Sequence, residues 1–260
     1  MRDILNDLSD MLRDADPVRR AQIKSRQELP KRFYENAGVG ETENGYSILL
    51  DGKPIRTPAK KLLELPTQKL AELICSEWNA QREEINPVSM PATRLVNTAI
   101  DGIASDPQAI VEDVLRFAGT DLICYRADGP QRLVDRQTEH WDPVVDWVHT
   151  ALGARFVLAE GVMHVEQPKE AITAIGIHLA GLKDPIALAS LHTFTTLTGS
   201  ALLAVAVARD FLTAEQAWTA AHIDEDWNAE QWGEDAEARA RRDFRWGEMQ
   251  AADRAFKALL

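Results

Sequence analysis

Five apolar residues near the N-terminus fall on one face of a short helix. They are Ile4, Leu5, Leu8, Met11 and Leu12. Their spacing of i, i+1, i+4, i+7 and i+8 is that of an amphipathic helix. Basic residues dominate from there to Arg32 without an apolar pattern. We therefore expect residues 1–30 to form a helical arm, either docked or mobile.

Residues 33–58 follow the pattern of short strands. The dipeptides Asn44-Gly45 and Asp51-Gly52 are typical of tight turns, and strand-forming residues flank each of them. They predict a three-stranded antiparallel meander with strands near residues 33–37, 46–51 and 53–57. Gly38-Val39-Gly40 is expected to be a loop before the hairpin, and no helix follows it that could hold a phosphate.

After Thr67 the apolar spacing becomes helical. Leu70, Ile74 and Trp78 lie on one face of a predicted helix, and a second helix is expected over residues 92–103. A sheet of three short strands needs a partner to bury its apolar side. The two helices are expected to supply it, giving a small α+β domain over residues 31–104.

Residues 105–260 are almost entirely helical in pattern. Asp106-Pro107 and Asp142-Pro143 each combine a capping residue with a proline suited to the first helical turn, so each predicts a helix start. Thr213–Gln216 has the capping-box pattern and predicts a long helix toward Trp232, with a last helix from about Asp235. A short β-like stretch is expected at residues 155–158 and 163–165.

The predicted fold class is therefore α+β. A small N-terminal antiparallel β-meander packs with helices, and a larger all-helical C-terminal domain follows it over residues 105–260.

The charge of the chain limits its partners. Among 260 residues, 29 Lys and Arg stand against 41 Asp and Glu, a net charge of −12. Nucleic-acid binding needs a basic face, so a nucleic-acid partner is not expected. The longest apolar run, Ala201–Ala208, is far shorter than the roughly 20 residues that span a membrane. With no signal or transit pattern at the N-terminus, the expected location is the cytoplasm.

The residue types that carry catalysis or bind metals are scattered. Cys75 and Cys124 lie in apolar stretches without metal-binding spacing, as expected of buried thiols in a reducing compartment. His140 and His149 are nine positions apart, on opposite sides of an ideal helix. No nucleophile lies in a recognisable motif with its base. The sequence predicts no catalytic residue, metal, cofactor or small-molecule substrate.

An acidic segment with two tryptophans stands out at residues 222–238, HIDEDWNAEQWGEDAEA. Aromatic side chains among like charges are typical of binding hot spots for an oppositely charged partner. The candidate partner-binding residues are Glu225, Asp226, Trp227, Trp232, Asp235 and Glu237. Two other interpretations remain open: a solvated face with both tryptophans packed inward, and a pair of catalytic carboxylates.

Several strings resemble one known family. They are KRFYENA at residues 31–37, DGKPIRTP at 51–58, EWNAQ and PVSMPATRL within 77–95, WDP at 141–143, and WNAEQWGEDAEA at 227–238. In this order they resemble the assembly chaperones that escort the α subunit of the catalytic sector of the F-type ATP synthase.

The resemblance implies a chaperone without enzymatic activity. Members bind the unassembled α subunit and shield the surface that it later presents to the β subunit. They act in mitochondria in eukaryotes, and this chain resembles a bacterial, cytoplasmic member. Acidic residues near the C-terminus are important in the family, and the resemblance implies that Glu225 and Glu237 correspond to them here.

Three hypotheses follow. The first is a chaperone for the ATP synthase α subunit. The second is a hydrolase that uses carboxylates of residues 224–237, which requires two of them to converge in a pocket with shifted pKa values. The third is a scaffold that binds several basic partners.

Overall fold

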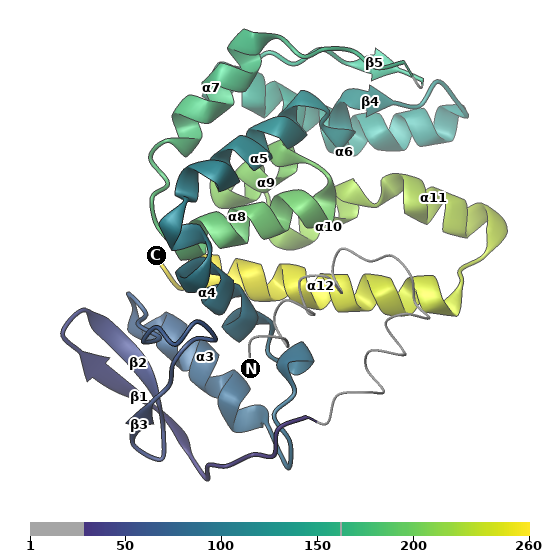
Figure 1. The fold of residues 1–260 in the computed structure, drawn as a ribbon. Helices are drawn as coiled ribbons and strands as arrows, with labels where there is room; N and C mark the ends of the chain where they lie inside the picture. Colours follow the sequence, from purple (N-terminus) through teal and green to yellow (C-terminus); the bar gives the residue numbers. More distant parts are fainter. Residues whose placement is uncertain (1–28, 162) are drawn as a thin grey trace. The chain divides into compact units, whose positions relative to one another are not determined.

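The computed structural model describes residues 29–161 and 163–260, and the chain divides after Gly102 into two compact units (Figure 1). Each unit is described by itself. The arm expected over residues 1–30 lies almost entirely outside the described residues.

A three-stranded antiparallel sheet forms the β part of the first unit. Its order is β1 (Ala37–Thr42), β2 (Gly45–Leu50) and β3 (Lys53–Pro54). The predicted meander is thus confirmed, but the position predicted for its first strand, residues 33–37, is wrong. Because the two-residue turn pairs Thr42 directly with Gly45, the first strand extends up to that turn.

The predicted glycine loop is therefore part of a strand. Gly38, Val39 and Gly40 lie within β1. A Cβ atom on Gly40 would lie 2.6 Å from a methyl carbon of Leu49. The glycine thus makes room for a leucine that crosses its strand.

Helix α3 (Gln68–Ala80) packs on strands β1 and β2, and its Leu70 and Ile74 are fully buried. Ile48 and Leu50 are buried on β2, at alternate positions of that strand. A 3-10 helix, η1 (Pro87–Ser89), leads into α4 (Pro91–Asp101). These apolar side chains form the core of the unit, as the helical spacing of the sequence predicts.

Glu77, in the EWNAQ string, joins α3 to the start of α4. Its two carboxylate oxygens accept hydrogen bonds from the backbone N–H of Ala92 (2.8 Å) and of Thr93 (2.7 Å), and from the Thr93 hydroxyl (2.7 Å). The first N–H groups of a helix have no partner within the helix. Glu77 of the EWNAQ string thus contacts the PVSMPATRL string in a structural role, as an acceptor for the start of α4.

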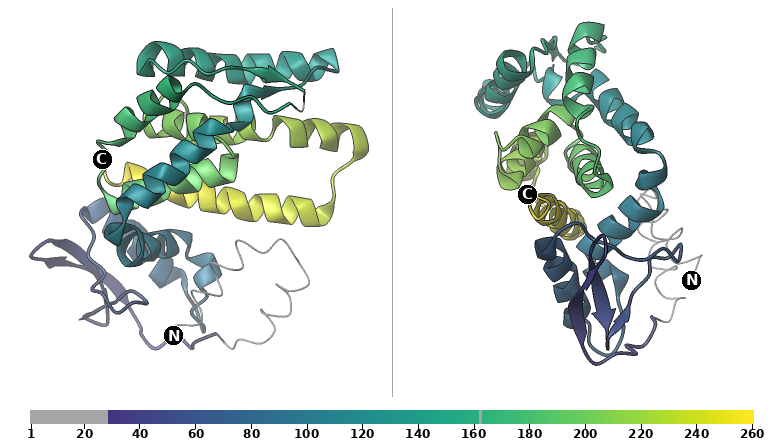
Figure 2. Two further views of the ribbon diagram at one scale, coloured as in Figure 1. Left: turned by 45° about the horizontal axis from the view of Figure 1, so that its top comes forward. Right: turned by 90° about the vertical axis from the view of Figure 1, so that its left-hand side faces the viewer.

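The second unit is helical. Its elements in chain order are η2 (Ile103–Ser105), α5 (Pro107–Gly119), η3 (Leu122–Cys124), β4 (Tyr125–Arg126), α6 (Gln131–Leu152), β5 (Ala159–Glu160), α7 (Lys169–Leu179), α8 (Pro185–Thr198), α9 (Ala201–Ala208), α10 (Ala214–Ala221), α11 (Ile223–Trp232) and α12 (Ala236–Lys257). Helices α8 and α9 are the most buried and lie among the others, as Figure 2 shows.

Helix α6 differs from the expectation. Asp142-Pro143 was predicted to open a helix, but α6 begins at Gln131 and continues through Pro143. A proline inside a helix loses one backbone hydrogen bond. Burial on both sides of it holds the helix together, since Trp141, Val144 and Val148 are all in the core.

Two further predictions need correction. The β-like stretch pairs only at Ala159–Glu160, parallel to β4, one residue beyond the predicted segment. The capping box at Thr213 is present, but the helix it opens ends at Ala221, and α11 starts beyond the buried His222. Asp235 caps α12, as expected.

Candidate functional site

The acidic segment, residues 222–238, forms helix α11, the residues that join it to α12 and the first three residues of α12. In Figure 1, α11 lies between α6 and the first half of α12, and a loop joins α11 to α12. Ile223 is the one buried residue of α11, and the first buried residue of α12 is Met249. We call residues 223–248 the acidic hairpin. Between Ile223 and Met249, the hairpin has no buried residue to form an apolar core.

Most acidic side chains of this hairpin are already engaged within the protein. Asp224 accepts a hydrogen bond from Gln137 Nε2 at 2.7 Å, and Glu230 accepts two from Arg136 at 2.9 and 3.0 Å. Asp226 pairs with Arg242, and Glu234 pairs with Arg239.

Two of these ion pairs raise the pKa values of their arginines. Hydrogen bonds to Glu230 and Asp226 raise the pKa values of Arg136 and Arg242, respectively. Three of the seven acids of residues 224–237 are thus closely paired with arginines, and the other four are not.

Four of the six predicted partner-binding residues are exposed: Asp235, whose side chain caps α12, and three others. The Trp232 side chain is 87% exposed, Glu225 is 63% exposed and Glu237 is 76% exposed. The two glutamates make only long contacts, each 3.9 Å: Glu225 with Nε2 of His222, and Glu237 with Nη1 of Arg241. These three residues are free to meet a partner.

The other three predicted residues have intramolecular roles. Asp235 caps α12 by accepting a hydrogen bond from the Ala238 N–H at 3.1 Å. Trp227 is half-buried, and the Arg136 guanidinium lies 5.7 Å from the centre of its ring. Asp226 is half-buried beside Arg242. One tryptophan thus packs against the protein, and the other points into solvent.

His222 marks the point where the hairpin leaves the body of the unit. Its Nδ1–H donates to the Trp218 carbonyl at 2.7 Å, and its ring lies 3.9 Å from that of Trp218. Burial lowers the pKa of His222, although the hydrogen bond to Trp218 acts in the opposite direction. A neutral, buried histidine therefore anchors the start of α11.

A cavity of about 470 Å³ lies between α6, α10, α11 and α12. Three carboxylates of the hairpin line it, those of Asp226, Glu230 and Glu234, together with Arg136 and Arg242. Each carboxylate is paired with an arginine. A general acid needs a carboxyl group that holds its proton near neutral pH, and a neighbouring cation opposes this. The arrangement does not support the hydrolase hypothesis.

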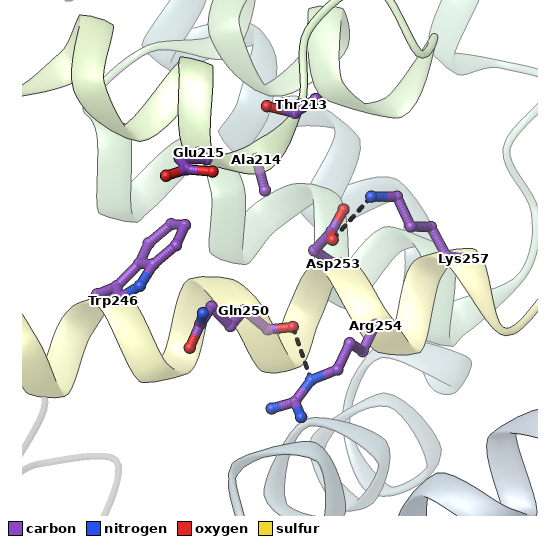
Figure 3. A pocket seen from close by; sticks show the side chains of 8 residues that line it. All are labelled: Thr213, Ala214, Glu215, Trp246, Gln250, Asp253, Arg254 and Lys257. Atoms are coloured by element: carbon purple, nitrogen blue, oxygen red, sulfur yellow. Dashed lines mark hydrogen bonds and ion pairs between the residues drawn. The ribbon is translucent and has the colours of Figure 1, made fainter.

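A second cavity of about 360 Å³ lies between α10 and α12 (Figure 3). Glu215 and Asp253 are the carboxylates that line it. Asp253 is paired with Lys257 at 2.9 Å, and Figure 3 shows its carboxylate turned toward that lysine. No converging acid pair is found here in the described part of the chain.

Two residues of α6 that contact the hairpin were missed by the sequence analysis. Arg136 and Gln137 lie about 90 positions before their partners in the chain. Periodicity predicts that residues of a helix share a face, but it does not predict which distant helix packs there.

The two cysteines and two half-buried histidines, His178 and His192, have structural surroundings. Cys124 is buried and Cys75 half-buried, and both are free thiols. His192 contacts Asp113 at 2.7 Å, and His178 contacts the Leu152 carbonyl at 3.2 Å. Across residues 29–161 and 163–260, no group of three or more potential ligands is placed to hold a metal ion. In the same residues, no helix is long and apolar enough to cross a membrane.

Comparisons with known proteins find the same family that the sequence strings resemble. Residues 31–149 match the family model of the ATP12 chaperone protein. Protein atp12, mitochondrial, from Schizosaccharomyces pombe is 23% identical over 215 residues, covering 78% of this chain and 74% of its own length.

Solved structures extend the similarity to the whole fold. The Atu1473 protein from Agrobacterium tumefaciens is 58% identical with a TM-score of 0.88, covering 100% of this chain and 97% of its own. Atp12 from Paracoccus denitrificans is 40% identical with a TM-score of 0.82, covering 88% and 98% respectively. The chain therefore belongs to the ATP12 chaperone protein family, the ATP synthase assembly chaperones that its sequence resembles.

Proposed function

We propose that this chaperone binds the unassembled α subunit of the ATP synthase catalytic sector and shields the surface that α later presents to the β subunit. A subunit that waits for its partner exposes an apolar patch prone to aggregation. The client class comes from the family, and the proposed contact is the acidic hairpin. We expect no enzymatic step, because shielding needs reversible binding alone. In a bacterial cell, this binding would take place in the cytoplasm.

The observation that carries the proposal is the exposure of Trp232. Tryptophan is a residue that proteins usually bury, and at interfaces it is enriched among the side chains that supply most binding energy. Here its side chain is 87% exposed, at the end of α11. A rigid aromatic group presented to solvent in this way suits insertion into a partner's pocket.

Charge supports the same surface. Residues 222–260 contain ten acidic and six basic side chains, a net charge of 6 − 10 = −4. Among the predicted partner-binding acids, Glu225 and Glu237 are exposed and make only long contacts of 3.9 Å with neighbouring residues. They would favour a client surface with basic residues around an apolar patch, and would speed the encounter with it.

The test is capture of purified, unassembled α subunit by charge-reversed variants. Glu225→Lys should weaken capture at least about tenfold while leaving the fold intact. Glu170→Lys is a matched control, because Glu170 is also an exposed acid in the first turn of a helix, α7. Unchanged capture by folded Glu225→Lys would remove this residue from the interface.

A second pair of variants tests the aromatic contact. Trp232→Ser should reduce the affinity for α by about 30-fold or more, the size typical of a hot spot. Ile177→Ser serves as control, since Ile177 is 70% exposed on α7. Equal capture by both variants would contradict the role proposed for Trp232. If a partner survey instead returned several unrelated basic proteins, the scaffold hypothesis would replace the chaperone.

A further inference from the structure

The attachment of α11 to the rest of its unit is mostly polar. Beyond Ile223, no residue of this ten-residue helix is buried. Its contacts with α6 are made at both ends by hydrogen bonds and an ion pair. The direction in which α11 projects is therefore not set by a hydrophobic core.

The first turn of α11 is held by a rigid side chain. Gln137 is 2% exposed, and its amide oxygen accepts a hydrogen bond from the Ala127 N–H at 2.8 Å. Its Nε2 donates to Asp224 at 2.7 Å. Because both ends of the Gln137 amide are engaged, this contact fixes the start of the helix.

The last turn of α11 is held by Arg136. Its Nη1 and Nη2 donate to the two carboxylate oxygens of Glu230 at 2.9 and 3.0 Å, the two-point geometry that makes such pairs strong and directional. The same guanidinium lies 5.7 Å from the ring centre of Trp227. One side chain of α6 thus holds two residues on the outer part of α11.

Loss of the Arg136 contact would allow α11 to rotate about its first turn, and the displacement would be largest at its far end. An α-helix rises 1.5 Å per residue, so Trp232 lies about 13 Å along the axis from Ile223. A rotation of about 20° around the first turn would then displace Trp232 by about 5 Å. Glu230 is two residues from Trp232, so the Arg136 contact lies where it limits this motion most.

We propose that Arg136 is a positioning residue for client binding: by clamping Glu230 and covering Trp227, it fixes the place at which α11 presents Trp232. This inference rests on the proposed function. The Arg136 side chain is half-buried at these contacts. In this proposal it acts on the client through α11, without touching it. Client recognition would thus depend on α6, which carries none of the predicted binding residues.

A double-mutant cycle separates positioning from direct contact. Arg136→Met and Glu230→Gln each break the same pair, and each should weaken capture of α by about three- to tenfold. The double variant should be no weaker than the stronger single variant. Arg132→Met is the matched control, because Arg132 is an exposed arginine one turn earlier on α6. It should leave capture unchanged.

Hydrogen exchange supplies the readout that does not depend on the client. In both single variants the amides of residues 224–235 should exchange faster, while the midpoint of thermal unfolding stays near that of the wild type. A general loss of stability would instead speed exchange throughout the unit, and that result would overturn the positioning role.

The remaining outcomes are also decisive. Additive losses in the double variant would mean that Arg136 contacts the client itself, and full capture by Arg136→Met would mean that it does nothing for binding. Either result contradicts the proposal. If the wild type captures no α subunit at all, the proposed function fails, while the exchange data still report whether Arg136 orders α11.

Discussion

The indole Nε1–H of Trp141 donates a buried hydrogen bond of 2.7 Å to the backbone carbonyl of Ala220. Trp141 belongs to the WDP string of α6, and Ala220 lies in the last turn of α10, two residues before His222. The bond therefore ties α6 to the point where the acidic hairpin begins.

Trp141→Phe tests this tie. The smaller ring keeps most of the packing but leaves the Ala220 carbonyl without its donor, so we expect the free energy of unfolding to fall by about 1–3 kcal/mol. Urea denaturation measures the change. Trp147→Phe is the control, since Trp147 is half-buried and stacks on Phe211 at 4.7 Å. An equal loss in both variants would show that ring volume matters here, and not the hydrogen bond.

Asp121 makes a prediction about pH. Its carboxylate is fully buried and accepts hydrogen bonds from the Ser200 hydroxyl (2.6 Å) and the Leu202 N–H (2.9 Å). Burial raises its pKa to about 6, from 3.8 for an ordinary aspartate. Between these values the folded state binds the proton more tightly than the unfolded state. The contribution of Asp121 to the free energy of unfolding therefore grows as the pH falls.

Asp121→Asn should abolish that contribution. The advantage of the wild type over the variant should increase by about 2.4 kcal/mol between pH 7 and pH 4, at 1.36 kcal/mol per pKa unit. Denaturant titrations at several pH values measure it. Asp146→Asn, at an exposed position of α6, should follow the wild type. A constant difference between wild type and Asp121→Asn would contradict the pKa shift.

Two aspartates with left-handed backbones should respond in opposite ways to glycine. Asp210 has φ = 57° after the end of α9, where glycine avoids the steric cost of a side chain. Asp210→Gly should raise the free energy of unfolding by about 0.5–1 kcal/mol. Thermal unfolding provides the measurement, and a lower midpoint would show that the side chain has a stabilising contact.

Asp51→Gly is the counterpart. Asp51 has φ = 48°, but its carboxylate accepts hydrogen bonds from the N–H groups of Glu35 (3.0 Å) and Asn36 (2.9 Å). These bonds lower the pKa of Asp51. We expect this variant to destabilise the sheet unit because two backbone donors lose their acceptor. Stabilisation by glycine at this position would mean that backbone strain outweighs the hydrogen bonds.

Glu77→Gln tests the join between α3 and α4. The amide has one acceptor oxygen where the carboxylate offers two, so its NH2 group would face a backbone N–H of α4. We expect a loss of about 1–3 kcal/mol in the free energy of unfolding. Glu72→Gln, at an exposed position of the same helix, should cost much less. Equal effects would rule out the capping role.

Local signals predicted most of the fold. The tight turn near Asn44 and the caps at Asp106, Thr213 and Asp235 depend on neighbouring residues alone, and all are found. The turn residues are Glu43 and Asn44, one position before the predicted pair. The errors have non-local causes. Asp142-Pro143 is typical of a helix start, but α6 continues through Pro143 because its residues on both sides are buried in the core.

The site was predictable only in part. A run of acids with two tryptophans locates the acidic hairpin, because local composition can be read directly from the sequence. It cannot show that Trp227 packs beneath Arg136 while Trp232 faces solvent. Nor can it show that arginines of α6 and α12 balance Glu230 and Asp226, since those pairings arise only when the helices pack.

The most direct test of the central claim is site-specific photo-crosslinking from position 232 to purified, unassembled α subunit. A photoreactive residue in place of Trp232 should crosslink to α, and the same residue in place of Ile177, on an exposed part of α7, should not. Crosslinks from position 177 and none from position 232 would contradict the claim that the acidic hairpin is the client-binding surface.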